Sequence, residues 1–273
     1  MIKIKNFSFK KENPTIMGIL NLTPDSFSDG NRYTDMDSAL KHVEKMLNDG
    51  ADIIDIGGES SRPGSMPVSL NEELDRVLGI TERVIDSFGC CVSIDTYKGE
   101  VAEETLKLGA SMINDIYGLS RSPEIASITA KYGAALCIMH MKGDPQNMQK
   151  NTEYSSISTD VFNFLKERYN FALSEGVDRE SIILDPGIGF GKSVEGNLEI
   201  IKDLKIYKDY NLLIGTSRKS FIGKILNLDV DKRLSATISS NVISFLNGAS
   251  IFRVHDVKEH YEALRLACDI VRS

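Results

Sequence analysis

The chain has 273 residues, of which 41% are hydrophobic and 26% charged, and this is the composition of a globular protein with room for one large core. Its net charge of −7 argues against a nucleic-acid partner, and no segment approaches the roughly 18 apolar residues of a membrane span. The N-terminal segment lacks the apolar core of a signal peptide, and the four cysteines have no CxxC spacing. We therefore expect reduced thiols in a cytoplasmic protein that binds no membrane.

The first predicted element is a small hairpin or strand in the alternating segment IKIKNFSF, residues 2–9, placed outside the main sheet against its bottom face. Eight short, continuous apolar runs follow, and such runs are typical of parallel strands that are buried on both faces. They are TIMGILN (15–21), ADIIDIG (51–57), CVSID (91–95), SMIND (111–115), AALCIMH (134–140), SIILD (181–185), NLLIG (211–215) and SIFRV (250–254).

The segments between these runs have the apolar spacing of amphipathic helices. DSALKHVEKMLNDG, residues 37–50, has apolar side chains at positions 40, 43, 46 and 47 and a terminating glycine. Ser69 and Glu72 form a predicted capping box ahead of the next helix. His42 and His260 lie on predicted helices, and we expect both at the surface.

Strands that alternate with helices predict the fold class. Eight strands over about 250 residues indicate an α/β protein, a single (β/α)8 TIM barrel with a short N-terminal β extension and one domain over residues 1–273. A doubly wound sheet is the alternative, but such sheets usually have about five to seven strands.

Polar residues follow every predicted strand, at the end where TIM barrels carry their active sites. Any one of them alone is more typical of a helix cap or a turn, but eight polar strand ends that converge on one rim predict a site. They are Asn21, residues 57–63, Asp95, Asn114 with Asp115, Met139 with His140, Asp185, residues 216–220, and Arg253 with His255 and Asp256.

The segment DPGIGFGKS, residues 185–193, resembles a nucleotide-binding loop at first sight. The P-loop spacing would place Pro186 where a glycine is needed, and the third glycine of a dinucleotide fingerprint is replaced by Lys192. Both nucleotide interpretations therefore fail, which leaves either a glycine-rich turn that approaches another ligand closely or a flexible loop without one. Lys192 stands seven residues after Asp185, and we expect its ammonium group to be solvated, away from the rim.

The predicted rim combines two kinds of chemistry. Asp95, Asn114 and Asp185 supply hydrogen-bond acceptors and an amide, which suit a planar heterocycle with adjacent N–H donors. Arg253, His255, Lys219 and Asn21 supply positive charge and a neutral oxygen, which suit a phosphate group with its metal ion. Among these motifs no dedicated nucleophile is evident, because Ser217 and Ser220 lack a base partner in the sequence pattern.

Eight motifs at these strand ends together resemble bacterial dihydropteroate synthase over residues 15–270. They are MGILNLTPDSFSDG (17–30), DIGGESSRPG (55–64), SIDT (93–96), IND (113–115), MHMKG (139–143), DPGIGFGKS (185–193), TSRKSFIG (216–223) and RVHDV (253–257). The resemblance implies a homodimeric TIM barrel that joins 6-hydroxymethyl-7,8-dihydropterin diphosphate to p-aminobenzoate. The products would be dihydropteroate and pyrophosphate, in folate synthesis.

The resemblance also implies roles for individual residues. Asp95, Asn114 and Asp185 would hold the aminopyrimidine edge of the pterin, with Met139 beneath the ring and Lys219 at its polar atoms. Asn21 would be the protein ligand to Mg²⁺, and Arg253 and His255 would meet the diphosphate together with Ser61 and Arg62. Phe27 and Asp29 would lie in a loop over the site, with Asp29 offsetting transient positive charge during catalysis. Phe190, Pro63, Ser61 and Ser220 would line the p-aminobenzoate pocket.

Some positions favour a plainer interpretation. Asp115, Asp256 and Glu59 are expected to orient their neighbours more than to touch substrate, and residues 141–156 are expected to form a variable loop. The family usually has Thr where Ser61 stands, so one methyl group, worth about 0.8 kcal/mol of apolar contact, is lost near p-aminobenzoate. The alternatives are a pterin-binding methyltransferase barrel, against which the basic segments SRKS and RVH weigh, and a pterin-binding protein without turnover.

Overall fold

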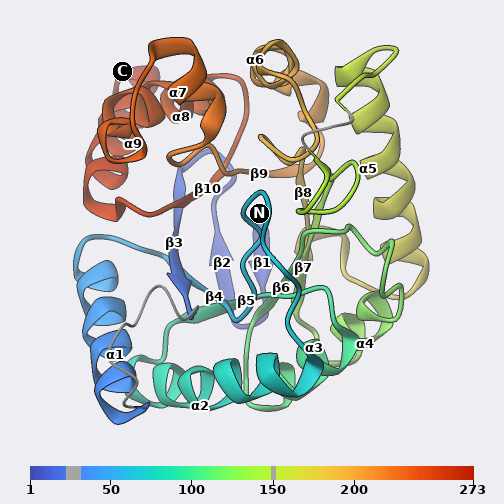
Figure 1. The fold of residues 1–273 in the computed structure, drawn as a ribbon, viewed down its shortest axis with the longest axis vertical. Coiled ribbons are helices and arrows are strands. Elements are labelled where there is room, and N and C mark those ends of the chain that lie inside the picture. The colour runs from blue at the N-terminus through green and yellow to red at the C-terminus, as the bar shows by residue number, and fades with distance from the viewer. Residues whose placement is uncertain (23–31, 149–151) are drawn as a thin grey trace.

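The computed structural model describes residues 1–22, 32–148 and 152–273, which form a closed barrel of parallel strands surrounded by helices (Figure 1). The barrel strands are β3 (Thr15–Asn21), β4 (Ile53–Gly57), β5 (Cys91–Asp95), β6 (Met112–Asp115), β7 (Ala135–Met139), β8 (Ile182–Asp185), β9 (Asn211–Ile214) and β10 (Ile251–Val254). They pair in the closed order β10-β3-β4-β5-β6-β7-β8-β9, and every pairing is parallel. The predicted (β/α)8 barrel is confirmed, and each predicted apolar run contains one barrel strand.

Helices connect the strands and cover the outside of the barrel (Figure 1). The α-helices are α1 (Arg32–Asn48), α2 (Leu70–Phe88), α3 (Gly99–Lys107), α4 (Ile125–Lys131), α5 (Ile157–Ser174), α6 (Val194–Lys202), α7 (Ser220–Leu226), α8 (Leu234–Leu246) and α9 (Val257–Arg272), with short 3₁₀ turns η3 (Arg179–Ser181), η4 (Leu204–Tyr207) and η5 (Val230–Lys232). At the start of α2 the Ser69 hydroxyl accepts a hydrogen bond from the Glu72 backbone N–H at 3.3 Å, as predicted. The Glu72 carboxylate pairs with Arg76 instead of returning to Ser69, so only half of the capping box forms.

The N-terminal hairpin closes one end of the barrel. Strands β1 (Ile2–Ile4) and β2 (Phe7–Phe9) pair antiparallel, and in Figure 1 they lie across the middle of the ring. Ile2 and Ile4 are fully buried against inward-facing apolar side chains of the barrel strands. Burying such a side chain contributes about 1.5–3 kcal/mol, so the hairpin is an integral plug, and the predicted contact with the bottom face is confirmed.

Side-chain alternation along each strand separates the packed layer from the interior of the barrel. In β4, Ile54 and Ile56 belong to the core between strands and helices, whereas Ile53 faces inward at the hairpin end. Asp55 and Gly57 follow Ile53 with a period of two and therefore face the interior further along. Strand β4 thus brings the Asp55 carboxylate inward, toward the end opposite the hairpin.

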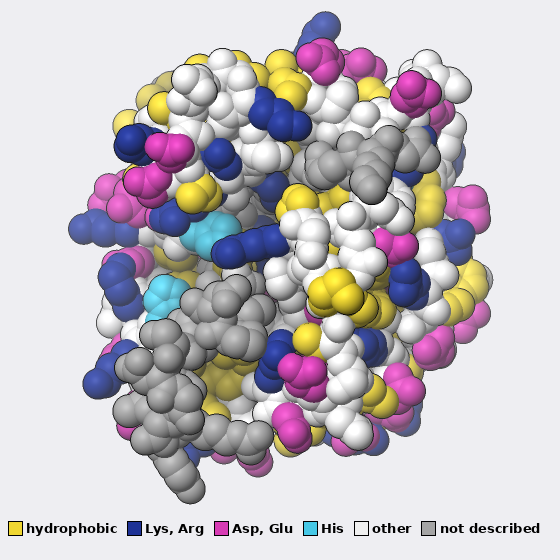
Figure 2. All heavy atoms as spheres, viewed as in Figure 1, with side chains coloured by type: hydrophobic (Ala, Val, Ile, Leu, Met, Phe, Trp, Pro, Cys, Tyr) yellow, Lys and Arg dark blue, Asp and Glu magenta, His cyan; other side chains and the backbone are white. Residues whose placement is uncertain are grey.

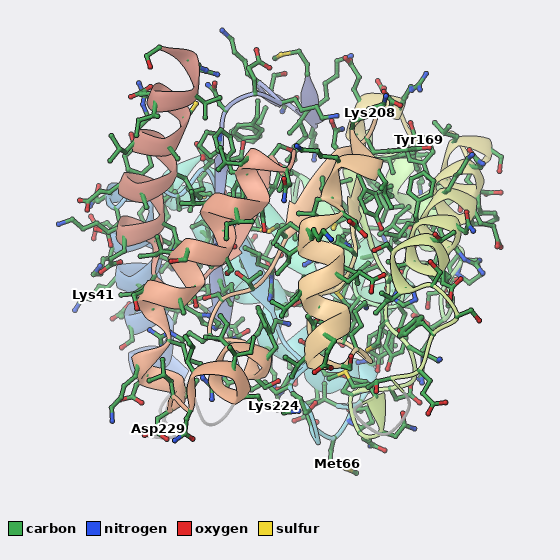
Figure 3. The ribbon with its side chains drawn as sticks, turned by 90° about the horizontal axis from the view of Figure 1, so that it is seen from above. Lys41, Met66, Tyr169, Lys208, Lys224 and Asp229 are labelled. Atoms are coloured by element: carbon green, nitrogen blue, oxygen red, sulfur yellow. The ribbon has the colours of Figure 1, made fainter. Side chains whose placement is uncertain are left out.

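The side view in Figure 3 separates the two ends of the barrel. Met66, in the connection after β4, and Asp229, in the connection after α7, lie at one end, and Lys208, which precedes β9, lies at the other.

Of the two helical histidines, His42 is exposed as expected, but the prediction for His260 is wrong. His260 lies in the buried stripe of α9, which also contains Val257 and Leu264, and its Nδ1 is 2.7 Å from the Asp256 carbonyl oxygen.

Candidate functional site

Two adjoining cavities open among the loops that follow the strands. The inner cavity, of about 450 Å³, is lined by Ile19, Ser61, Asp95, Asn114, Ile116, Met139, Asp185, Ile188, Phe190, Gly215, Ser217, Lys219, Arg253 and His255. The outer cavity, of about 1380 Å³, is lined by Asn21, Ser60, Ser61, Arg62, Pro63, Met148, Gly189, Phe190, Ser217, Arg218, Lys219, Ser220, Val230, Arg233, Arg253 and His255. Six residues line both, so the two cavities form one continuous site: Ser61, Phe190, Ser217, Lys219, Arg253 and His255.

A buried ion-pair network forms the floor of the inner cavity. The Arg253 guanidinium, on β10, reaches across the barrel and donates to Asp55 on β4 and to Asp95 on β5, both at 2.6 Å. The Asn114 amide on β6 also donates to Asp55, at 3.4 Å. Burial raises the pKa of Asp95, and the Arg253 guanidinium opposes that shift by favouring the carboxylate. The network therefore holds the carboxylates of β4 and β5 together beneath the inner cavity.

Two oxygen atoms of this floor lack a hydrogen-bond partner among residues 1–22, 32–148 and 152–273. They are the Oδ1 atoms of Asn114 and Asp55, and both are buried. Buried polar atoms in native proteins are almost always hydrogen-bonded, so the orphaned oxygen of Asn114, which lines the inner cavity, indicates a ligand with N–H donors, whereas Asp55 lies behind the cavity lining. Asp55 was missed at the sequence level. Its signal was an acidic residue at the inward period of an otherwise apolar strand.

Asp185 lies at the end of β8 on the next side of the inner cavity. Its Oδ1 accepts the Gly187 backbone N–H at 2.7 Å, which fixes the carboxylate at the strand end. Burial raises the pKa of Asp185 to about 6, opposed by that hydrogen bond and by the charge of Lys219. Gly187 has φ +67°, and a Cβ there would lie 2.0 Å from the His140 carbonyl oxygen, so only glycine fits this close turn.

The remaining walls of the inner cavity suit a flat ring. Ile116, Met139 and Phe190 line this cavity and form one apolar cluster with Met148, which lines the outer cavity. The Lys219 ammonium lies 3.8 Å from the centroid of the Phe190 ring, a cation–π contact in the boundary between the two cavities. Burial lowers the pKa of Lys219 to about 8, and Asp185 favours its charged form. The predicted direction of Lys219, into the mouth of the barrel, is confirmed.

His255 is held by a serine that the sequence pattern left without a partner. The Ser217 hydroxyl oxygen lies 2.9 Å from His255 Nδ1 and accepts the backbone N–H of His255 at 3.2 Å. A serine oxygen has two acceptor lone pairs and one proton, so this contact orients the ring in either tautomer of His255. Burial and the Arg253 charge lower the pKa of His255 to about 4, so the imidazole is neutral. The prediction that Ser217 lacks a base partner is therefore wrong, and we interpret the pair as an orienting contact for His255.

The outer cavity is lined by positive charge. Five cationic side chains border it, and the described lining contains no aspartate or glutamate: Arg62, Arg218, Lys219, Arg233 and Arg253. In Figure 2, histidine and Lys or Arg side chains gather beside one another at the hollow in this face. Asn21, Ser61, Pro63 and Ser220 also line this cavity, as predicted for site residues. Arg218 and Arg253 are already paired with carboxylates, so the remaining positive charge is that of Arg62, Lys219 and Arg233, and in a chain with a net charge of −7 it indicates an anionic ligand.

The plainer interpretations agree with the structure where it describes them. Asp115 accepts the backbone N–H groups of Tyr117 and Leu119, and Asp256 pairs with Arg218. Glu59 pairs with Lys98, and none of these three acidic residues lines the inner or outer cavity. Phe27 and Asp29 fall in residues 23–31, outside the described part of the chain, and their roles stay predictions.

The prediction for Lys192 is wrong. The side chain is 3% exposed rather than solvated, and its Nζ lies 2.9 Å from the Gly187 and Phe190 carbonyl oxygens. The seven-residue separation of Lys192 from Asp185 does not carry the lysine away from the strand end. Glycines with positive φ at 187, 189 and 191 fold the loop back upon itself. Lys192 borders neither cavity.

Known proteins share this architecture and sequence. The profile described as pterin binding enzyme matches residues 17–255. A dihydropteroate synthase from Clostridium beijerinckii is 48% identical over 264 residues, which are 96% of this chain and 96% of that protein. The chain belongs to the dihydropteroate synthase family of pterin-binding enzymes. It is therefore an enzyme of the transferase class.

Solved structures of family members superpose closely on the chain. The Yersinia pestis dihydropteroate synthase with a sulfonamide drug has a TM-score of 0.93 and 39% identity, covering 100% of this chain and 99% of that one. The Xanthomonas albilineans enzyme with 7,8-dihydropteroate has a TM-score of 0.85 and 32% identity, covering 97% and 96%. In the part of the chain that the structure describes, every helix is too short or too polar to cross a membrane.

Proposed function

We propose that the chain transfers the dihydropterin methylene group of 6-hydroxymethyl-7,8-dihydropterin diphosphate to the amine of p-aminobenzoate, in folate synthesis. The observation that carries this proposal is the separation of charge between the cavities. Acceptors for a donor-rich ring lie in the inner cavity, and cations for a diphosphate lie around the outer one. In the test, both substrates together, and neither alone, yield dihydropteroate and pyrophosphate in equal amounts.

The pterin ring is assigned to the inner cavity. Asp95, Asn114 and Asp185 would accept hydrogen bonds from its amino group and ring N–H groups, and the orphaned Oδ1 of Asn114 would gain a partner. A hydrogen bond to a charged acceptor contributes about 1.5–3 kcal/mol, so these contacts decide ring binding. Met139 would pack beneath the ring and Lys219 would reach its polar atoms.

The diphosphate is assigned to the outer cavity. His255 would contact it through the imidazole ring that Ser217 orients, and Arg62 would add positive charge beside the Ser61 hydroxyl. Arg253 borders both cavities, but its Nε and one Nη are already committed to Asp55 and Asp95. Its main effect is therefore to keep the pterin-binding carboxylates ionised while it adds positive charge behind the diphosphate.

The residues present fit a Mg²⁺ ion that is held largely by substrate. Asn21 offers a carboxamide oxygen at the outer cavity, and Mg²⁺ commonly takes one or two protein oxygens together with phosphate oxygens and water. The described residues contain no group of three His, Cys, Asp or Glu side chains able to cage a metal. When bound, Mg²⁺ would neutralise charge on the diphosphate.

The reaction then depends on positioning and on charge. The methylene C–O bond breaks with its electron pair on the departing pyrophosphate, and the cation left behind is delocalised into the pterin ring. His255, Arg62 and Lys219 stabilise the developing negative charge. The aniline nitrogen forms the new C–N bond, and its proton passes to pyrophosphate or solvent. Phe190, Ser61, Pro63 and Ser220 would hold the aromatic ring of p-aminobenzoate for this attack.

p-Aminobenzoate is expected to bind weakly alone and at least about tenfold more tightly with Mg²⁺ and pyrophosphate, within the usual range of coupling between sites. The reason is that cations and a serine-rich loop form its pocket, and an anion would neutralise and order both. Calorimetric titration checks this, with chloride at matched ionic strength as the control. Equal affinity in the two conditions would contradict the assembled pocket.

The affinity for a pterin analogue without phosphate is expected to be greatest between about pH 6 and pH 8. Asp185 can accept hydrogen bonds from both the amino group and a ring N–H of the pterin only when it is ionised. The affinity therefore falls as the pH decreases through its pKa of about 6. Lys219 loses its charge as the pH rises through about 8, so affinity falls there as well. The alkaline loss should disappear in Lys219→Met; its persistence would assign that titration to the ligand or to another group.

We further propose a homodimer in the cytoplasm, joined through α8. This helix contains no charged residue, and its exposed positions Ser235, Ser239, Ile243 and Leu246 share one face. Ile243→Lys is therefore expected to yield monomers in sedimentation analysis, because a buried unpaired charge opposes association. Ser127→Lys at an exposed position of α4, a helix that packs against α3 and α5, is the control and should stay dimeric. A dimeric Ile243→Lys variant would exclude this face.

Two alternative functions predict different results in the transfer assay. A pterin-binding methyltransferase would release no pyrophosphate, and the cationic outer cavity has no evident use in that reaction. A pterin-binding protein without turnover would bind the pterin diphosphate and leave it intact. The described cavities contain every predicted site residue except Phe27 and Asp29, which favours the transferase.

A further inference from the structure

Lys192 is a buried cation that neither cavity uses. Its Nζ lies within hydrogen-bond distance of four acceptors: the carbonyl oxygens of Gly187 and Phe190 at 2.9 Å each, the His140 carbonyl oxygen at 3.2 Å, and His140 Nδ1 at 3.0 Å. No ion pair within 4.0 Å involves Lys192 in the described chain. The ammonium is thus held in a cage of backbone carbonyls, and this cage joins the end of β7 to the loop after β8.

The cage depends on the glycines of residues 185–193. Gly187, Gly189 and Gly191 have φ of +67°, +86° and +66°, which turn the chain back so that Lys192 lies beneath the loop it follows. A Cβ at Gly191 would lie 2.4 Å from the Lys142 carbonyl oxygen, so the loop is also pressed against the segment after β7. Burial lowers the pKa of Lys192 to about 7, opposed by the charge of Asp185. Charged or neutral, the amine keeps N–H donors for the carbonyls.

The loop held in this way carries Phe190. The carbonyl oxygen of Phe190 is one of the Lys192 acceptors, while its ring lines both cavities and receives the Lys219 ammonium at 3.8 Å. Asp95 and Asn114 lie on strands, so their positions depend on the barrel itself, and Asp185 ends a strand and also accepts the Gly187 N–H. Phe190 lies on a loop, and its position depends on what holds that loop.

We propose that Lys192 is a positioning residue for the second substrate, which fixes Phe190 against p-aminobenzoate without touching either substrate. This inference rests on the proposed placement of p-aminobenzoate beside Phe190. Loss of the cage should free the loop carbonyls, displace the Phe190 ring and weaken the contact with Lys219, while the strand-borne pterin contacts remain.

Lys192→Met keeps the length of the side chain and removes its donors. We expect the KM for p-aminobenzoate to rise at least about tenfold, with the Kd of a pterin analogue changed less than about threefold. The matched control is Lys202→Met at the end of α6, the helix that follows the loop; this side chain is exposed and borders neither cavity, and its replacement should change neither constant. A purely structural role would lower the melting temperature without this split, and unchanged constants in folded Lys192→Met would overturn the proposal.

A double-mutant cycle separates this inference from the assignment of the pocket. Phe190→Leu should itself raise the KM for p-aminobenzoate, and adding Lys192→Met should then raise it less than about threefold further, because both changes act through one ring. No effect of Phe190→Leu would refute the substrate placement, whereas full additivity would refute the role of Lys192 alone. Lys192→Gln, which keeps one donor group, should lie between the wild type and Lys192→Met. If neither Lys192 variant folds, the residue serves folding and the proposal fails.

Discussion

Asp185→Asn is expected to weaken binding of a pterin analogue about 100- to 1,000-fold, or roughly 3–4 kcal/mol, while the fold remains intact. Asn keeps an oxygen that can accept the Gly187 N–H, now at 2.7 Å from Oδ1. The second oxygen becomes an NH₂ group that faces the donors of the ring, so one attractive contact becomes repulsive. Isothermal titration calorimetry of the folded variant measures the loss.

Asp256→Asn is the matched control for this experiment. Asp256 also follows a barrel strand, but it pairs with Arg218 and does not line the inner cavity. Its replacement should change pterin affinity only a few-fold. An unchanged affinity in Asp185→Asn would mean that the ring does not lie against β8.

Lys219→Ala is expected to lower kcat/KM roughly 30- to 1,000-fold, or about 2–4 kcal/mol. The ammonium lies at the junction of the two cavities, over the Phe190 ring and close enough to Asp185 to favour its ionised form. Its removal deletes a contact to the pterin and part of the positive charge that faces the leaving group. Steady-state kinetics with each substrate varied in turn measures the effect.

Lys224→Ala is the control, since Lys224 lies on α7, which begins directly after Lys219, but is exposed and borders neither cavity (Figure 3). It should keep activity within about twofold of the wild type, as expected of a surface substitution away from the site. A loss in Lys224→Ala as large as that in Lys219→Ala would assign the effect to α7 as a whole. Full activity of Lys219→Ala would remove that lysine from the catalytic machinery.

Much of this structure could be predicted because its signals are local. Buried parallel strands require continuous apolar runs, and the alternation of such runs with amphipathic helices left few folds to consider. The polar residues at the strand ends were equally readable, because a barrel brings all those ends to one rim. Asp95, Asn114 and Asp185 meet there as expected.

Most of the predictions that were wrong or missing depend on contacts between residues that are distant along the chain. Asp55 is an inward-facing residue inside a strand, and its partners are Asn114 and, 198 positions away, Arg253. Ser217 gains its partner from His255, and His260 is buried by the packing of α9. Lys192 returns to its own loop through three left-handed glycines, a path that counting residues cannot show.

The central claim is that pterin and diphosphate occupy separate cavities within one site, and a competition titration tests it most directly. A pterin analogue without phosphate and pyrophosphate with Mg²⁺ are each titrated against protein already saturated with the other. Both are expected to bind at once with little loss of affinity, whereas pterin diphosphate should displace both. Mutual displacement of the pterin analogue and pyrophosphate would contradict the claim.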